Sequence, residues 1–152
     1  MDNSYESDKL LGEYLLFHYG QDEQLMPWPN GPKNGLRFPV RTVRELIDTS
    51  SLPSTPSRAF DVGCSVGRST FEIASFCDEV IGCDLSHSFI SAARSLVNEK
   101  ELPYTYLEEG DFYRSALAKA EFDSSKQISF LVEDACSLPT KLNSFDLVHA
   151  AN

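Results

Sequence analysis

The chain has 152 residues, which is enough for one domain with its own core. Its formal net charge of −10 argues against a nucleic-acid partner, because a protein this acidic needs a basic patch to approach phosphates and the sequence contains none. No apolar run approaches the roughly 20 residues that span a bilayer, and the polar start at residues 1–4 is unlike a signal peptide. We therefore expect a cytoplasmic protein that has no membrane partner and acts on a small-molecule substrate.

The cysteines form no C-x-x-C pair and have no spacing typical of zinc ligands. We interpret them as reduced packing residues and expect no metal site. The four are Cys64, Cys77, Cys83 and Cys136.

Two helices and a loop are predicted at the start of the chain. Residues 4–19 are expected to form a helix, with Tyr14 and His18 on one face at helical spacing. Prolines and glycines predict a loop over residues 21–38, and a loop of that length is often functional. A second helix is expected over residues 39–49, because proline is favoured in a first helical turn.

Strands and helices alternate from residue 58 onward, which predicts an α/β fold with right-handed crossovers and a mostly parallel sheet with flanking helices. Residues 116–122 are expected to form a further helix, and residues 103–107 either a short strand or an extended loop. The main elements are strand 58–62, helix 67–76, strand 79–83, helix 87–99, strand 128–132 and strand 145–151.

The most informative segment is a glycine-bearing loop that follows the first strand. Asp61 ends the apolar run, and Gly63 and Gly67 have no Cβ to keep a ligand from the backbone. The spacing is G-x-S-x-G, which differs from the dinucleotide fingerprint G-x-G-x-x-G and disfavours an NAD-binding Rossmann domain. Asp84 ends the second strand about 20 residues later, where an acid accepts hydrogen bonds from ribose hydroxyls. These features favour a nucleoside ligand.

The order acid-x-Gly-x-Ser-x-Gly resembles the first motif of the seven-stranded, class I S-adenosylmethionine-dependent methyltransferases, with Ser65 where that family often has glycine. The resemblance implies a Rossmann-like fold with S-adenosylmethionine as cofactor. It assigns the methionine end of the cofactor to the glycine loop, the ribose to Asp84 and the adenine to the acid-Ala pair after the third strand. The implied cofactor-binding residues are Asp61, Gly63, Cys64, Gly67, Asp84, Leu85, Asp134 and Ala135.

Other roles are open for the three acids of this set. Asp61 could cap the loop, Asp84 could cap the helix that begins near Ser86, and Asp134 could be a solvated acid at a strand end. Members of the family continue with further strands, so we expect a fragment or a truncated product that lacks the C-terminal strands. The chain then divides into an N-terminal lid or substrate cap, residues 1–57, and a partial methyltransferase domain, residues 58–152.

Residues 4–20 narrow the resemblance to the methyltransferase module of the ovothiol pathway, as do residues 61–69 and 133–136. That resemblance implies N-methylation of a small histidine-derived thiol, 4-mercaptohistidine, by a protein that acts with, or is fused to, a non-haem iron sulfoxide synthase module. The alternative is a truncated or diverged module that binds S-adenosylmethionine without transferring its methyl group.

Methyl transfer to an imidazole nitrogen requires mainly alignment, so we assign no catalytic residue. A lid that contacts the substrate is expected from aromatic residues of the first helix, although their spacing also fits ordinary packing. His149 alternates with apolar neighbours on a predicted strand and is expected to be structural. The substrate candidates are Tyr5, Tyr14, His18 and Asn152.

Overall fold

The computed structural model of the protein describes residues 6–54 and 57–151. Its centre is a four-stranded sheet in the order β5-β2-β1-β6, in which every neighbouring pair is parallel. The predicted α/β class with a mostly parallel sheet is therefore confirmed, and all four predicted strands are present. They are β1 (Arg58–Val62), β2 (Glu79–Asp84), β5 (Gln127–Val132) and β6 (Leu147–Ala150).

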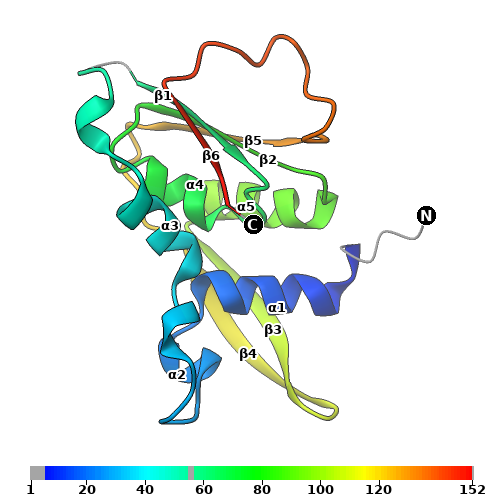
Figure 1. Cartoon of the computed structure of the whole chain (residues 1–152). Coiled ribbons are helices and arrows are strands. Elements are labelled where there is room, and N and C mark those ends of the chain that lie inside the picture. Colours follow the sequence, from blue (N-terminus) through cyan, green and yellow to red (C-terminus); the bar gives the residue numbers. More distant parts are fainter. Residues whose placement is uncertain (1–5, 55–56, 152) are drawn as a thin grey trace.

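Helices cover the face of the sheet onto which Ala59 and Val80 project (Figure 1). Helix α4 (Arg68–Ile73) is shorter than predicted, whereas α5 (His87–Glu99) has the predicted bounds. Each has a buried apolar side, represented by Phe71 on α4 and Phe89 on α5. Burial of such side chains contributes about 1.5–3 kcal/mol each.

The segment between α5 and β5 forms a hairpin of β3 (Glu101–Glu109) and β4 (Phe112–Lys119), paired antiparallel in a separate two-stranded sheet. The helix predicted over residues 116–122 is wrong, and residues 103–107 are strand. Alanine and lysine favour a helix in isolation, but here cross-strand pairing and burial of Tyr104 and Ala118 decide the conformation.

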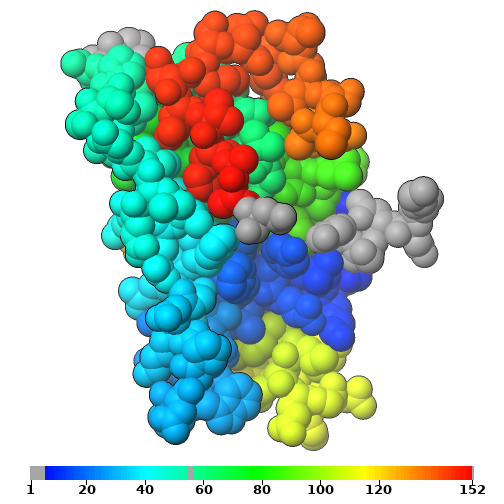
Figure 2. Space-filling view, viewed as in Figure 1, coloured from blue at the N-terminus to red at the C-terminus, as the bar shows by residue number. Residues whose placement is uncertain are grey.

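Helix α1 (Asp8–Tyr19) packs on this hairpin, and its Leu15 belongs to the same core cluster as Tyr104. Ser7 caps the helix by accepting from Leu10 N, so the helix begins later than the predicted residue 4. In Figure 2, α1 (blue) lies between the hairpin (yellow) and the part of the molecule drawn in green, orange and red. The N-terminal segment therefore packs into the domain.

The predicted loop over residues 21–38 contains two short helical turns, α2 (Asp22–Leu25) and η2 (Lys33–Gly35). Helix α3 (Phe38–Leu46) follows and ends earlier than predicted, before the turn η3 (Thr49–Ser51). An ion pair between Arg44 of α3 and the buried Glu72 of α4 joins it to the domain. Across residues 6–54 and 57–151, no helix is both long and apolar enough to span a membrane.

Candidate functional site

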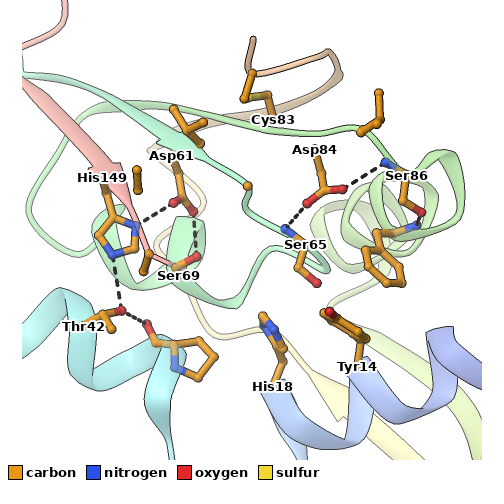
Figure 3. A pocket seen from close by; sticks show the side chains of 18 of the residues that line it. Tyr14, His18, Thr42, Asp61, Ser65, Ser69, Cys83, Asp84, Ser86 and His149 are labelled. Atoms are coloured by element: carbon orange, nitrogen blue, oxygen red, sulfur yellow. Dashed lines mark hydrogen bonds and ion pairs between the residues drawn. The ribbon is translucent and has the colours of Figure 1, made fainter. Parts of the chain in front are cut away.

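The carboxyl ends of β1, β2, β5 and β6 open into one cavity of about 570 Å³. Residues of α1 and α3 close its opposite side, so the N-terminal segment supplies part of the wall (Figure 3). Ligands of open α/β sheets bind at this edge, outside the carboxyl ends of the strands. The cavity is therefore the candidate binding site.

The loop after β1 is held to the end of β2 by its backbone. The N–H groups of Gly63 and Cys64 both donate to the carbonyl oxygen of Cys83, at 2.8 and 2.9 Å. Gly63, Ser65 and Gly67 have φ angles of +71°, +51° and +87°, in the left-handed region that favours glycine. Ser65 thus adopts a backbone conformation that favours glycine, at a position where the methyltransferase family that the sequence resembles often has glycine.

Asp84 joins this loop to the start of α5. Its Oδ2 accepts a hydrogen bond from Ser65 N at 3.0 Å, and its Oδ1 accepts one from Ser86 N at 2.9 Å. The side chain of Ser86 caps α5 by accepting from Phe89 N. Asp84 therefore lies in the cavity wall with both carboxylate oxygens oriented by backbone N–H groups.

Asp61 is almost completely buried, and three side chains surround its carboxylate. The hydroxyls of Ser69 and Thr70 each donate to Oδ2 at 2.7 Å, while Oδ1 lies 2.7 Å from Nδ1 of His149. The other ring nitrogen of His149 lies 3.3 Å from the hydroxyl of Thr42 on α3. Asp61 is thus the centre of a buried polar network that extends into the N-terminal segment.

The segment after β5 contributes Asp134 and Ala135 to the cavity wall. Asp134 is exposed, and its Oδ1 accepts from Cys136 N at 2.8 Å. Leu85, which follows β2, also lines the cavity and is 59% exposed. An exposed apolar side chain beside an open cavity can pack against the face of a flat ligand.

Tyr14 and His18 of α1 line the cavity, whereas Tyr5 and Asn152 lie outside the described residues. Burial lowers the pKa of His18 to about 3, and the nearby positive charge of Arg68 acts in the same direction. His18 is therefore neutral at pH 7. Its Nδ1 is buried and has no hydrogen-bond partner within the described part of the chain, and the same is true of Ser65 Oγ.

The described lining of the cavity carries four carboxylates, from Asp61, Asp84, Glu133 and Asp134, and no Lys or Arg side chain. Aromatic side chains of Tyr14, Phe17, Phe38 and Phe89 form much of the remainder. Such a surface favours an uncharged or cationic ligand with an aromatic group over an anionic one.

Residues 60–152, more than half of the chain, match the family described as methyltransferase domain. This chain belongs to that family. No curated protein matches the sequence significantly.

Solved structures resemble this methyltransferase domain at low sequence identity. The YcgJ protein of Bacillus subtilis is 20% identical, with a TM-score of 0.51 over 72% of this chain and 37% of its own. Magnesium protoporphyrin IX methyltransferase (ChlM) of Synechocystis, solved with bound SAM, is 19% identical, with a TM-score of 0.47 over 97% of this chain and 63% of its own. The chain thus spans less than two thirds of the length of either structure, and the similarity to YcgJ supports the fold.

Most residues predicted for the site of this methyltransferase domain meet in the cavity. Two do not line it: Cys64 is buried beneath the loop, and Gly67 forms the end of the turn by donating from its N–H to Cys64 O. The predicted residues that do line the cavity are Asp61, Gly63, Asp84, Leu85, Asp134, Ala135, Tyr14 and His18.

Sequence reasoning missed several polar residues of the cavity wall, among them Thr42, Ser69 and His149. Ser69 follows the glycine loop directly, so its place at the start of α4 offered a local signal. His149 and Thr42 offered none, because their contacts join segments that are far apart in the sequence.

Proposed function

We propose that this methyltransferase domain binds S-adenosylmethionine in the cavity and catalyses transfer of its methyl group to a small molecule. The observation that carries the proposal is that residues from the ends of β1, β2 and β5 converge on one cavity. These are Asp61, Gly63, Asp84, Leu85, Asp134 and Ala135, the positions that match the family's cofactor motifs.

The residues present fit this cofactor. A Cβ added at Gly63 meets no described atom within 4 Å, so the loop backbone is open to the cavity. The unpartnered Ser65 Oγ lies beside it and offers a donor or an acceptor. Gly63 and Ser65 would hold the methionine end and Asp84 the ribose hydroxyls. Asp134 and Ala135 would meet the adenine, with Leu85 beside it. When bound, the cofactor supplies an activated methyl group on a cationic sulfonium, whose charge suits the acidic lining.

For the acceptor we propose a small histidine-derived thiol, 4-mercaptohistidine, methylated on a ring nitrogen. The resemblance of residues 4–20 to the ovothiol-pathway module supports this choice, as does the aromatic lining beside Tyr14 and His18. In this proposal residues 1–57 form a cap that aligns the acceptor and excludes water. Tyr5 and Asn152 remain candidate contacts, and a non-haem iron sulfoxide synthase module is the proposed partner or fusion.

His18 contributes to this alignment as a hydrogen-bonding group. Because burial lowers its pKa to about 3, the side chain is a poor general base at neutral pH. A neutral imidazole offers one donor and one acceptor, and the acceptor or donor at Nδ1 has no partner in the described residues. A hydrogen-bond donor of the ligand would satisfy Nδ1 if it is the acceptor nitrogen, and an acceptor of the ligand would satisfy it if it carries the proton.

Calorimetric titration with S-adenosylmethionine tests the binding half of the proposal. We expect saturable binding that is lost in Asp84→Ala and retained in Asp111→Ala, the matched control, because Asp111 is exposed in the β3–β4 turn outside the cavity lining. No binding by the folded chain would contradict the proposed function.

Mass spectrometry of 4-mercaptohistidine incubated with protein and cofactor tests the transfer half. Gain of one methyl group, dependent on Asp84, is the expected result. Binding without transfer to this acceptor would contradict the proposed substrate and leave a cofactor-binding domain.

A further inference from the structure

The start of α5 presents four backbone N–H groups that have no partner within the helix, as does the start of any α-helix. The side chain of Asp84 accepts from the first of them, Ser86 N, and the side chain of Ser86 accepts from the last, Phe89 N. The two N–H groups between them belong to His87 and Ser88. Their acceptor comes from a distant part of the chain.

Glu6 supplies both of these acceptors. Its Oε1 accepts from His87 N at 2.9 Å and its Oε2 accepts from Ser88 N at 3.1 Å, so one carboxylate bonds to two adjacent N–H groups. The contacts join residues that are 81 and 82 positions apart in the chain. A carboxylate at a helix N-terminus forms charge-assisted hydrogen bonds and interacts favourably with the helix dipole. Glu6 therefore completes the N-terminus of α5.

The turn that Glu6 holds also carries the candidate for ribose binding. Asp84, Leu85 and Ser86 connect β2 to α5, and all three line the cavity. Each oxygen of Asp84 accepts one N–H, from Ser65 or from Ser86, and keeps a lone pair for a further donor. Figure 3 shows the Asp84 carboxylate between these two N–H groups, with Ser86 at the start of α5. The position of the carboxylate thus depends on the conformation of this turn.

Glu6 also directly precedes the cap of α1, whose side chains form another part of the cavity wall. Tyr14 and His18 of α1 line the cavity, and the Tyr14 ring lies 4.5 Å from the ring of Phe89, measured between centroids. Glu6 therefore joins the beginning of this helix to the turn that carries Asp84. One polar contact connects two parts of the wall.

We propose that Glu6 is a positioning residue of the cavity, whose carboxylate holds the first turn of α5, and through it Asp84, in the conformation that binds ribose hydroxyls. The effect on ligand binding rests on the proposed function, whereas the hold on the turn does not. Without Glu6, the N–H groups of His87 and Ser88 would bond to water, and the first turn of α5 would fray. Asp84 would then have to be ordered when ligand binds, which lowers affinity.

Amide hydrogen exchange in the chain without ligand, followed residue by residue by NMR, tests the hold on the turn. In Glu6→Ala, we expect the amides of His87 and Ser88 to exchange about ten-fold faster than in wild type, as for loss of a hydrogen bond to a charged group. The amide of Ser86, which donates to Asp84, should also exchange faster, because it belongs to the same turn.

Two controls separate this local effect from a general loss of stability. The amide of Leu96, a buried residue in the interior of α5, should keep its wild-type exchange rate. Glu13→Ala removes an exposed carboxylate of α1 that pairs with Lys9 outside the described cavity lining, so it should leave all these amides unchanged. Unchanged exchange in the first turn of α5 in Glu6→Ala, or equal acceleration at Leu96, would overturn the proposal.

Calorimetric titration with S-adenosylmethionine, and with an analogue that lacks both ribose hydroxyls, tests whether Glu6 acts through Asp84. For S-adenosylmethionine, we expect Glu6→Ala to raise the dissociation constant about ten-fold and Glu13→Ala to leave it unchanged. The dissociation constant of the analogue should change little in either variant, because the analogue has no ribose hydroxyl for Asp84 to bind.

An equal rise for both ligands in Glu6→Ala, or undiminished affinity for S-adenosylmethionine, would overturn the positioning role. If wild-type protein binds no S-adenosylmethionine, the proposed function fails, and the exchange measurement still decides whether Glu6 holds the first turn of α5.

Discussion

The hydroxyl of Tyr19, at the end of α1, donates a hydrogen bond to the carbonyl oxygen of Val66 in the glycine loop at 2.9 Å. Burial raises the pKa of Tyr19 well above its ordinary value of 10, so the phenol remains a protonated donor at neutral pH. The guanidinium of Arg68 lies over the Tyr19 ring, 5.7 Å from its centroid. The N-terminal segment thus supports the loop on which the proposed cofactor site is built.

Replacing Tyr19 with Phe should destabilise the fold by about 1–3 kcal/mol, because the buried Val66 carbonyl loses its donor while the aromatic ring remains. Urea unfolding measures the change. Tyr113→Phe is the matched control, since Tyr113 is 57% exposed on β4 and its hydroxyl can bond to water. Equal stability of the two variants would show that the Tyr19 contact contributes nothing.

The two glycines of the loop should respond differently to alanine. Gly67 has φ +87°, and a Cβ there would lie 2.7 Å from Cζ of Phe130, so strain and overpacking combine to cost about 2–5 kcal/mol. Gly63 has φ +71° but open space around its Cβ position, so only about 1–2 kcal/mol of backbone strain is expected. Denaturant unfolding of both variants measures these costs.

Gly63→Ala should nevertheless weaken S-adenosylmethionine binding, because its methyl group projects into the space that the ligand would occupy. Titration of the folded variant tests this. Undiminished affinity would show that no ligand approaches the loop at Gly63.

The parts of the fold that could be predicted from sequence are those with local causes. An apolar run before Asp61 marks β1, and Ser86 before an amphipathic segment marks the start of α5, whose predicted bounds are confirmed. Asp84 ends β2, as predicted, and the end of a parallel strand places its side chain at the carboxyl edge of the sheet.

The remaining features have non-local causes. The β3–β4 hairpin replaced a predicted helix because strand pairing and the packing of α1 decide the conformation of residues 112–119. His149 contacts Asp61 and Thr42, which are 88 and 107 residues away in the chain. No periodicity or motif indicates such contacts, so only the folded structure shows them.

Stability should fall below pH 6.5 because of His18. Burial lowers the pKa of His18 to about 3, so the unfolded chain, with an ordinary value near 6.5, binds a proton that the folded chain does not. The contribution of His18 to the free energy of unfolding is therefore complete above pH 6.5 and is lost as the pH falls toward 3. The loss is at most about 1.4 kcal/mol per pH unit for this one group.

Urea unfolding at pH 7.5, 6.5 and 5.5 measures how the free energy of unfolding changes with pH. Most carboxylates stay ionised over this range, because their ordinary pKa values are roughly 4. His18→Phe should have a shallower slope than wild type, while His87→Gln, which removes an exposed histidine, should not. Equal slopes in wild type and His18→Phe would show that His18 binds protons equally in the folded and unfolded chain, and so that its pKa is not lowered by folding.

Thiol reactivity should distinguish one cysteine from the other three. Burial raises the pKa of the Cys64, Cys77 and Cys83 thiols, and the thiolate is the reactive form, whereas Cys136 is exposed in the turn after Asp134. With a thiol-reactive disulfide such as Ellman's reagent, we expect one rapid equivalent from native protein and the remaining three only after unfolding. Cys136→Ser should abolish the rapid phase. A second rapid equivalent that S-adenosylmethionine suppresses would identify Cys83, which lines the cavity. Because the Cys83 thiol is buried in the structure, that result would show that the cavity opens enough to admit the reagent.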